Sequence, residues 1–260
     1  MITSLQLLRF ELSKMFYLKS LRVSLLFFAV FPLLWAYAPG IFDVYGFFVV
    51  SGFQVPGLVL RSSMEFLLPL LVAVASAELF GLEVQHGTLS TILLRPLARG
   101  QWLMAKVAAA CLYPFVLLYA LLLLSLAAGA FFGFDAFQGG TGVGTSGLVG
   151  MGLMTPRAAL LELLRAYTIA AYSLLPSSLL ALLASVLVVR ASAGALTALA
   201  AIIVMRLLIV FPWLEPYLLT SQLDAYLRQN QRLLTSMLYV ALHMLVFITA
   251  AVLVFDRKDV

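Results

Sequence analysis

The residues best suited to chemistry lie in one short polar stretch, Glu83 to Lys106, between two long apolar runs. This stretch carries three basic residues, Arg95, Arg99 and Lys106. Basic side chains on a connecting loop can form charge-assisted hydrogen bonds with carboxylates on another protein. A charged connection of this length is unusual in an otherwise apolar chain.

The local sequence of this stretch predicts a short helix between two long ones. Gly87-Thr88 offers a helix stop followed by a new N-cap, and Pro96 cannot continue a helix. Residues Leu89 to Leu94 can form about one and a half turns between these two signals. We expect this short helix to lie across the membrane plane, on a surface that another protein grips.

The same residues resemble the signature of the permease subunits of type-2 ABC exporters, in which Glu, Gly-Thr-hydrophobic, Leu-Leu, Pro, Arg and Lys follow in that order. The residues that carry the resemblance, or lie within it, are Glu83, His86, Gly87, Thr88, Leu89, Leu93, Leu94, Arg95, Pro96, Arg99 and Lys106. The closing Phe255-Asp256-Arg257-Lys258-Asp259 is similar to the charged tail common in that family.

The resemblance implies that residues 83–101 form a cytoplasmic coupling loop. In that interpretation the Thr88–Leu94 helix inserts into a groove on a separate ATPase. Arg95 and Arg99 pair with acidic residues at the rim, and Glu83 anchors the hinge to the second span. The alternative is an ordinary cytoplasmic loop whose basic residues only set the membrane topology.

Composition places the whole chain in a membrane. Of its 260 residues, 64% are hydrophobic and only 10% are charged, whereas soluble domains are nearer half apolar and a quarter charged. The net charge of +5 comes from basic residues at the ends of apolar runs, not from a basic face, so nucleic acid is not an expected partner. A single Cys111 excludes a disulfide framework.

The apolar runs predict an all-α polytopic fold, a single permease domain over residues 1–260 with six transmembrane helices. The expected spans are 21–38, 62–82, 102–132, 158–189, 195–211 and 233–255. Three further segments are expected outside the spans on the outer face: an apolar loop at 43–61 that dips into the bilayer, a flexible Gly-rich loop at 133–157, and a re-entrant or amphipathic segment at 212–232.

Residues 1–20 predict an amphipathic helix in the membrane interface. Its apolar face would comprise Leu5, Leu8, Leu12, Met15 and Phe16. Its basic residues Arg9, Lys14 and Lys19 would lie toward the polar side. The alternative is a continuous extension of the first span. The resemblance favours the interfacial helix, which in the family lies beside the ATPase.

Charge sets the orientation. With both termini inside, the cytoplasmic side holds ten basic residues: Arg9, Lys14, Lys19, Arg22, Arg95, Arg99, Lys106, Arg190, Arg257 and Lys258. The outer side holds five: Arg61, Arg157, Arg165, Arg228 and Arg232. This asymmetry follows the positive-inside rule, so both termini are expected in the cytoplasm.

Five charged residues are predicted to lie within spans: Glu65 and Glu78 in the second, Glu162 and Arg165 in the fourth, and Arg206 in the fifth. Charges at membrane depth face the bundle interior or a wet cavity, or reach the interface by snorkelling. Glu162 and Arg165, three positions apart, can pair on one helix face. Arg206 and Glu65 could line an outward-facing path or pair across spans.

Several activities are excluded or disfavoured. No Lys follows a Gly, so the chain has no phosphate-binding loop, and ATP and Mg would bind on the partner. His86 and His243 have no carboxylate or Cys set around them, so neither a metal site nor a cofactor is expected on this chain. Gly144-Thr-Ser-Gly147 matches the Gly-x-Ser-Gly motif of intramembrane serine proteases. This Ser lies in a Gly-rich loop, so a protease is not expected.

The sequence thus predicts a non-catalytic, dimeric permease subunit of an ABC exporter in a bacterial or archaeal cytoplasmic membrane. Its partners would be two copies of a cytoplasmic ABC ATPase, a second copy of itself or a paralogue, and the lipid bilayer. The apolar walls favour an amphiphilic or lipid-like substrate. The alternative is a membrane assembly or mechanotransmission module that an ABC ATPase drives without moving solute.

Overall fold

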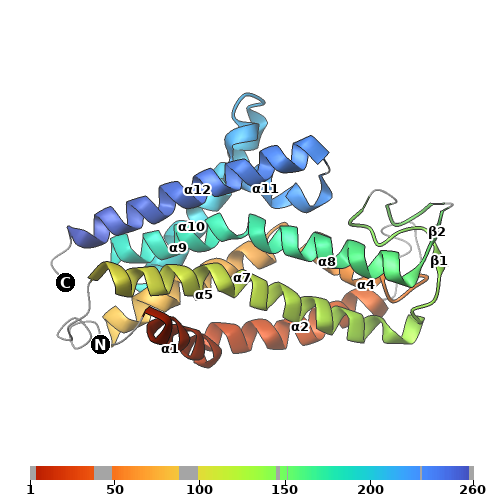
Figure 1. Cartoon of the computed structure of the whole chain (residues 1–260), viewed down its shortest axis with the longest axis horizontal. Coiled ribbons are helices and arrows are strands. Elements are labelled where there is room, and N and C mark those ends of the chain that lie inside the picture. The colour runs from red at the N-terminus through yellow and green to blue at the C-terminus, as the bar shows by residue number, and fades with distance from the viewer. Residues whose placement is uncertain are drawn as a thin grey trace.

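The computed structural model describes residues 4–37, 49–87, 99–144, 147–150, 152–228 and 230–257. It is an elongated bundle of helices (Figure 1). Six helical segments in this part of the chain are long and apolar enough to cross a membrane. They confirm the all-α polytopic fold, and each overlaps one of the six spans that the sequence predicts.

The membrane-crossing segments are built from one helix each or from two helices in succession. They are α2 (Lys19–Tyr37), α5 (Leu67–Gln85), α7 (Arg99–Gly129) with η1 (Ala130–Phe132), α8 (Pro156–Ser173) with α9 (Leu175–Val188), α10 (Ala191–Leu207) with η2 (Leu208–Val210), and α12 (Asn230–Asp256). Pro176 lies in the first turn of α9, where its missing N–H breaks no helical bond.

The bundle has two distinct ends (Figure 1). Helix α1 (Ser4–Tyr17) and the last turn of α12 lie at one end, which we call the terminal end. At the other, the hairpin end, strands β1 (Phe137–Gln138) and β2 (Leu153–Met154) pair antiparallel with Phe137 opposite Met154. The Gly-rich segment expected to be a flexible loop therefore contains a short hairpin, and its Thr141 is buried.

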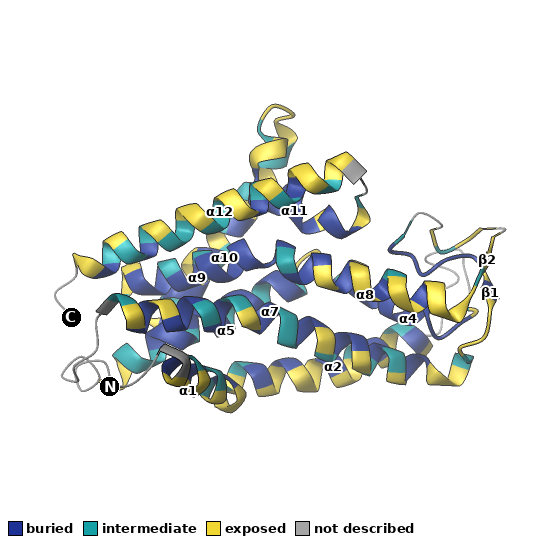
Figure 2. Ribbon diagram, viewed as in Figure 1, coloured by how far each residue is buried: buried dark blue, intermediate teal, exposed yellow. Residues whose placement is uncertain are grey.

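Small residues allow the central helices to approach closely. A side chain at Gly81 of α5 would collide with the backbone of Ala191 in α10, and one at Gly194 would collide with Ser185 of α9. Helices in lipid associate through such close backbone contacts because burial from water supplies no driving force there. The α8–α9 span is the most enclosed of the six and α12 the least, as Figure 2 shows by its exposed outer face.

The second span begins later than predicted. A separate short helix, α4 (Gln54–Met64), lies almost wholly buried where an outer loop was expected, and the chain turns at Glu65 before α5. Pro69 has no N–H to bond the carbonyl of Glu65, which favours the break there. The prediction that Glu65 lies within the span is therefore wrong: Glu65 is exposed at the junction of α4 and α5.

Helix α1 is separate from the first span, because the helix is interrupted at Leu18. Its buried face differs from the predicted one. Leu7, Glu11 and Met15 are buried, whereas Phe16, which was placed on the apolar face, is 58% exposed. The predicted face was chosen by apolarity alone, and a buried carboxylate at Glu11 cannot be recognised that way.

Two connections shape the remaining bundle. Val189 adopts the left-handed conformation (φ 61°) and ends α9, so α10 begins two residues later and the turn is very tight. After α10 the chain folds back through η3 (Glu215–Tyr217), α11 (Leu219–Gln222) and η4 (Leu223–Leu227). Residues Leu218 to Leu223 are buried in this returning segment.

Candidate functional site

Four charged side chains from three helices meet at the terminal end; we call them the ion network. Glu11 and Lys14 come from α1, Glu83 from α5 and Lys106 from α7. Lys106 Nζ lies 3.0 Å from Glu11 Oε2 and 2.9 Å from Glu83 Oε1. Lys14 Nζ lies 2.5 Å from the same Glu83 oxygen and 3.3 Å from Glu11 Oε1. Each lysine thus bridges both carboxylates.

Lys106 is the most deeply buried member, with no exposed surface. Its ammonium also donates to the backbone oxygen of Leu79 at 2.6 Å and lies 4.7 Å from the centre of the Trp102 ring. A buried ammonium is strongly disfavoured unless it is paired and hydrogen-bonded. Two carboxylates and a carbonyl meet that requirement here, so removal of either glutamate would leave the buried ammonium with one carboxylate and one carbonyl.

Aromatic packing joins the last span to the same region. Trp102 of α7 stacks on Phe255 of α12 at 5.4 Å between ring centroids, and Phe80 of α5 meets both rings edge-on. Such pairs contribute about 0.5–1.5 kcal/mol each beyond the area they bury. The ion network and these rings together hold α1, α5, α7 and α12 in contact at the terminal end.

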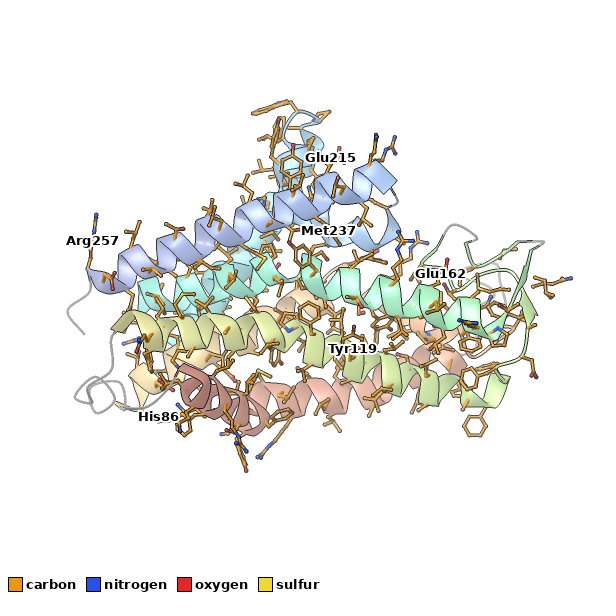
Figure 3. All side chains as sticks on the ribbon, viewed as in Figure 1. His86, Tyr119, Glu162, Glu215, Met237 and Arg257 are labelled. Atoms are coloured by element: carbon orange, nitrogen blue, oxygen red, sulfur yellow. The ribbon has the colours of Figure 1, made fainter. Side chains whose placement is uncertain are left out.

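The ion network lies next to both ends of the predicted coupling loop, since Glu83 begins the loop and Lys106 follows it. Helix α5 ends at Gln85, His86 is exposed at the terminal end (Figure 3), and Gly87 adopts a left-handed conformation (φ 66°) with its N–H bonded to Val84 O. Gly87 therefore acts as the helix stop that the sequence predicts. The predicted short helix and the residues Thr88, Leu89, Leu93, Leu94, Arg95 and Pro96 lie outside the described residues. So does the side chain of Arg99, the first residue of α7.

The structure brings together three of the predicted site residues: Glu83, Lys106 and Lys14. The other basic residues of the predicted interfacial helix, Arg9 and Lys19, are exposed. Sequence reasoning missed Glu11. The one available signal was that Glu11 is the only acidic residue before Asp43, on a helix otherwise rich in apolar and basic residues.

The predicted intramembrane charges do not form one site. Glu78 lies half-buried in α5, and its Oε2 atom is buried without a hydrogen-bond partner. Glu162 accepts a hydrogen bond from Thr141 Oγ1 at 2.6 Å, and no ion pair in the described part of the chain joins it to Arg165. Arg206 donates to the backbone oxygen of Glu65, so these two residues do meet across the bundle.

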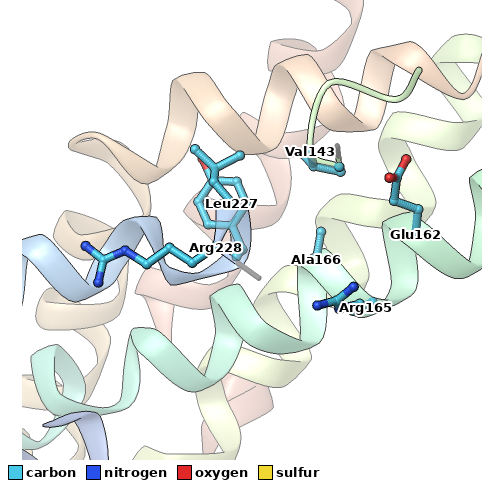
Figure 4. Close-up of a pocket in the computed structure, with 8 residues that line it drawn as sticks. Val143, Glu162, Arg165, Ala166, Leu227 and Arg228 are labelled. Carbon is cyan, nitrogen blue, oxygen red and sulfur yellow. The ribbon is translucent and has the colours of Figure 1, made fainter. Parts of the chain in front are cut away.

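Glu162 and Arg165 line a small cavity of about 20 Å³ at the hairpin half of the bundle. Figure 4 shows both residues on α8, with Arg228 across the cavity and its side chain extending away from Glu162. A space of this size holds about one water. Among the described residues, no group of three or more His, Cys, Asp or Glu could hold a metal ion.

Comparison with known families agrees with this architecture. Residues 7–188 match the family model described as ABC-2 family transporter protein, a match that covers more than half of the chain and includes most of α1, all of α5 and α7, and the predicted coupling loop. A search of curated proteins returned no match. The family implies a membrane component of an ABC transporter, which works with an ABC ATPase. The chain therefore belongs to the ABC-2 family of transporter permeases.

Proposed function

We propose that this chain is the dimeric membrane subunit of an ABC exporter and that the ion network couples it to two copies of a separate cytoplasmic ATPase. ATP and Mg bind on that partner, and this chain catalyses no reaction. The terminal end faces the cytoplasm of a bacterial or archaeal cell, with both termini inside. The substrate is amphiphilic or lipid-like and moves outward from the cytoplasm or the inner leaflet.

The observation that carries the proposal is the position of the ion network. Glu83 lies in the last turn of α5, which leads toward residues 88–98, and Lys106 lies two turns into α7, which follows them. Glu11 joins both to α1 through Lys106 and Lys14. Movement of this connection is therefore transmitted to α1, α5 and α7 together.

The charge asymmetry expected from the sequence, ten basic residues inside against five outside with Arg206 left within a span, supports the orientation. Single cysteines placed at Gln85 and at Val149, both exposed, test it in a Cys111→Ser background. We expect the Gln85 site to react only after the membrane is permeabilised, whereas the Val149 site reacts in intact cells. The reverse pattern would refute the proposal.

Alanine substitutions at Gly87 and, as a control, at Gly100 test the coupling of ATP hydrolysis to transport. The tagged chain is purified with the ATPase that accompanies it, and the complex is reconstituted in phospholipid vesicles. Gly87→Ala places a side chain at a left-handed residue with open space around it, so it strains the hinge without a collision. We expect ATP hydrolysis to continue while outward movement of a short-chain fluorescent phospholipid falls about tenfold, within the range of coupling energies between sites.

Gly100→Ala is the matched control, because Gly100 lies in α7 and a side chain there also meets open space. It should keep both activities. Equal transport by the Gly87→Ala variant would contradict the coupling role, and failure of any ATPase to accompany the chain would contradict the proposal as a whole. Export of a strongly hydrophilic solute in place of the lipid probe would refute the substrate class alone.

A further inference from the structure

A second charged region lies away from the ion network, in a cavity of about 140 Å³. Its walls come from the junction of α4 and α5, the end of α10 and the returning segment that contains η3, α11 and η4. Figure 3 places Glu215 of η3 on the part of this segment that projects beside α12. At about 30 Å³ per molecule the cavity would hold about five waters, more than one structural water requires.

Two arginines line the cavity, and neutral groups hold both of them. Arg206 donates to the backbone oxygen of Glu65. That oxygen lacks its helical donor because Pro69, four residues on, has no N–H. Arg228 donates to Ser221 O at 2.7 Å, Gln222 Oε1 at 3.2 Å and Ser236 Oγ at 2.6 Å. Both guanidinium groups are positioned without being neutralised by a contacting carboxylate.

Three carboxylates, those of Glu65, Glu215 and Asp224, line the same cavity. All ion pairs found in the described part of the chain belong to the ion network, so these carboxylates and the two arginines are unpaired with one another. Burial raises the pKa of the Asp224 carboxyl, and the nearby Arg206 and Arg228 oppose that rise. Groups of both signs thus face one space without direct contact.

Two hydroxyl groups in the cavity wall also lack partners. Thr220 and Ser221 are 5% and 6% exposed, and the Oγ atoms of both are buried without a hydrogen bond. A buried hydroxyl without a partner costs about 1–3 kcal/mol. Two adjacent ones at a cavity lined by charge indicate a ligand that supplies the missing bonds.

The chemistry of the lining selects the class of ligand. An anion alone would face three carboxylates, and a cation alone would face two arginines. No cluster suited to a metal ion occurs among the residues that the structure describes. A group that carries both a phosphate and a primary ammonium satisfies the arginines and hydroxyls with its oxygens and the carboxylates with its N–H groups.

The surroundings of the cavity favour a lipid as the source of that group. Ile203, Leu207 and Val210 lie on the same side of the α10 segment as Arg206 and are 48–79% exposed. Trp213 and Tyr217, also exposed, follow directly. Exposed apolar side chains ending in aromatic ones are typical of a helix that leaves the bilayer at its interface, where acyl chains could lie beside a bound head group.

We propose that this cavity binds the head group of an aminophospholipid, with Arg206 and Arg228 on its phosphate, Thr220 and Ser221 on its phosphate oxygens, and Glu65, Glu215 and Asp224 around its ammonium. The site belongs to this chain alone and needs no ATPase. Its failure would leave the coupling proposal untouched, and loss of coupling would leave lipid binding untouched.

Lipid retention tests the proposal. The chain is reconstituted in nanodiscs of equal phosphatidylethanolamine and phosphatidylglycerol, released into detergent, and its retained lipids are quantified by mass spectrometry. We expect the ethanolamine lipid to exceed the glycerol lipid about fivefold, which corresponds to about 1 kcal/mol. The double variant Arg206→Gln/Asp224→Asn should retain both equally. Arg232→Gln/Asp135→Asn, at exposed positions outside the cavity, should keep the preference.

A hydroxyl variant separates binding from folding. Thr220→Val/Ser221→Ala removes two unpartnered polar groups, so the folded protein should be at least as stable, yet the lipid preference should fall. Soluble phosphoethanolamine should compete for the site, whereas ethanolamine alone and glycerol 3-phosphate alone should not. Equal retention of the two lipids by the unmodified chain, an unchanged preference in the hydroxyl variant, or competition by either half of the head group would overturn the proposal.

Discussion

Two charged regions lie within this mostly apolar chain, the ion network at the terminal end and the cavity beside α10. In the ion network each lysine contacts both glutamates within 3.3 Å. In the cavity the charges share a space but none of its arginines contacts a carboxylate within 4 Å in the described structure. Charges that satisfy one another join helices, whereas charges held apart remain free to bind something else.

The largest effect should come from removing a member of the ion network. Lys106→Met leaves the buried Glu11 and the partly buried Glu83 with Lys14 as their one remaining cation in the ion network, and we expect it to destabilise the fold by about 3–5 kcal/mol. Thermal unfolding of the purified chain in detergent measures this effect. Lys19→Met, at an exposed lysine of the neighbouring helix, is the control and should change little. Equal unfolding temperatures for the two variants would show that the ion network is not a structural joint.

A smaller effect is expected from a substitution in the cavity beside α10. Arg228→Met removes three hydrogen bonds to neutral acceptors but leaves no carboxylate that depended on a direct ion pair. We expect a loss of about 2 kcal/mol in the same unfolding assay. Arg232→Met, at an exposed arginine in the first turn of α12, controls for removal of a positive charge. A loss as large as that of Lys106→Met would contradict the distinction between the two regions.

The smallest effect should be a pH dependence at Asp224. Burial raises its pKa above the ordinary 3.8, so the folded state binds a proton more tightly than the unfolded state. This group therefore favours folding at low pH, and that contribution is lost as the pH rises through the folded pKa. Unfolding temperatures of the native chain and of Asp224→Asn should coincide below 3.8, and the variant should become relatively more stable above it.

Asp135→Asn, at an exposed carboxyl of the hairpin end, provides the comparison for that titration. The Asp224 variant should differ from it in the direction of the pH dependence. If Asp224→Asn instead lost stability as the pH rose, the carboxylate would be paired in the folded state. The charges of the cavity would then pair with one another, as those of the ion network do.

The amino-acid sequence alone determined the six membrane-crossing segments, because a run of about 20 apolar residues has few stable alternatives in a bilayer. It also determined the helix stop at Gly87, since glycine readily adopts the left-handed conformation. The family resemblance around Glu83 to Lys106 was likewise legible in the residues and agrees with the family match.

Only the tertiary structure decided which charges meet. Glu11 and Lys106 are 95 positions apart, and no periodicity links them; they meet because α1 packs against α7. Arg206 and Glu65, separated by 141 positions, meet because Pro69 frees a carbonyl at a helix junction that hydropathy placed inside a span. Hydropathy reports how apolar a segment is, but the partner of a buried charge depends on how helices pack in three dimensions.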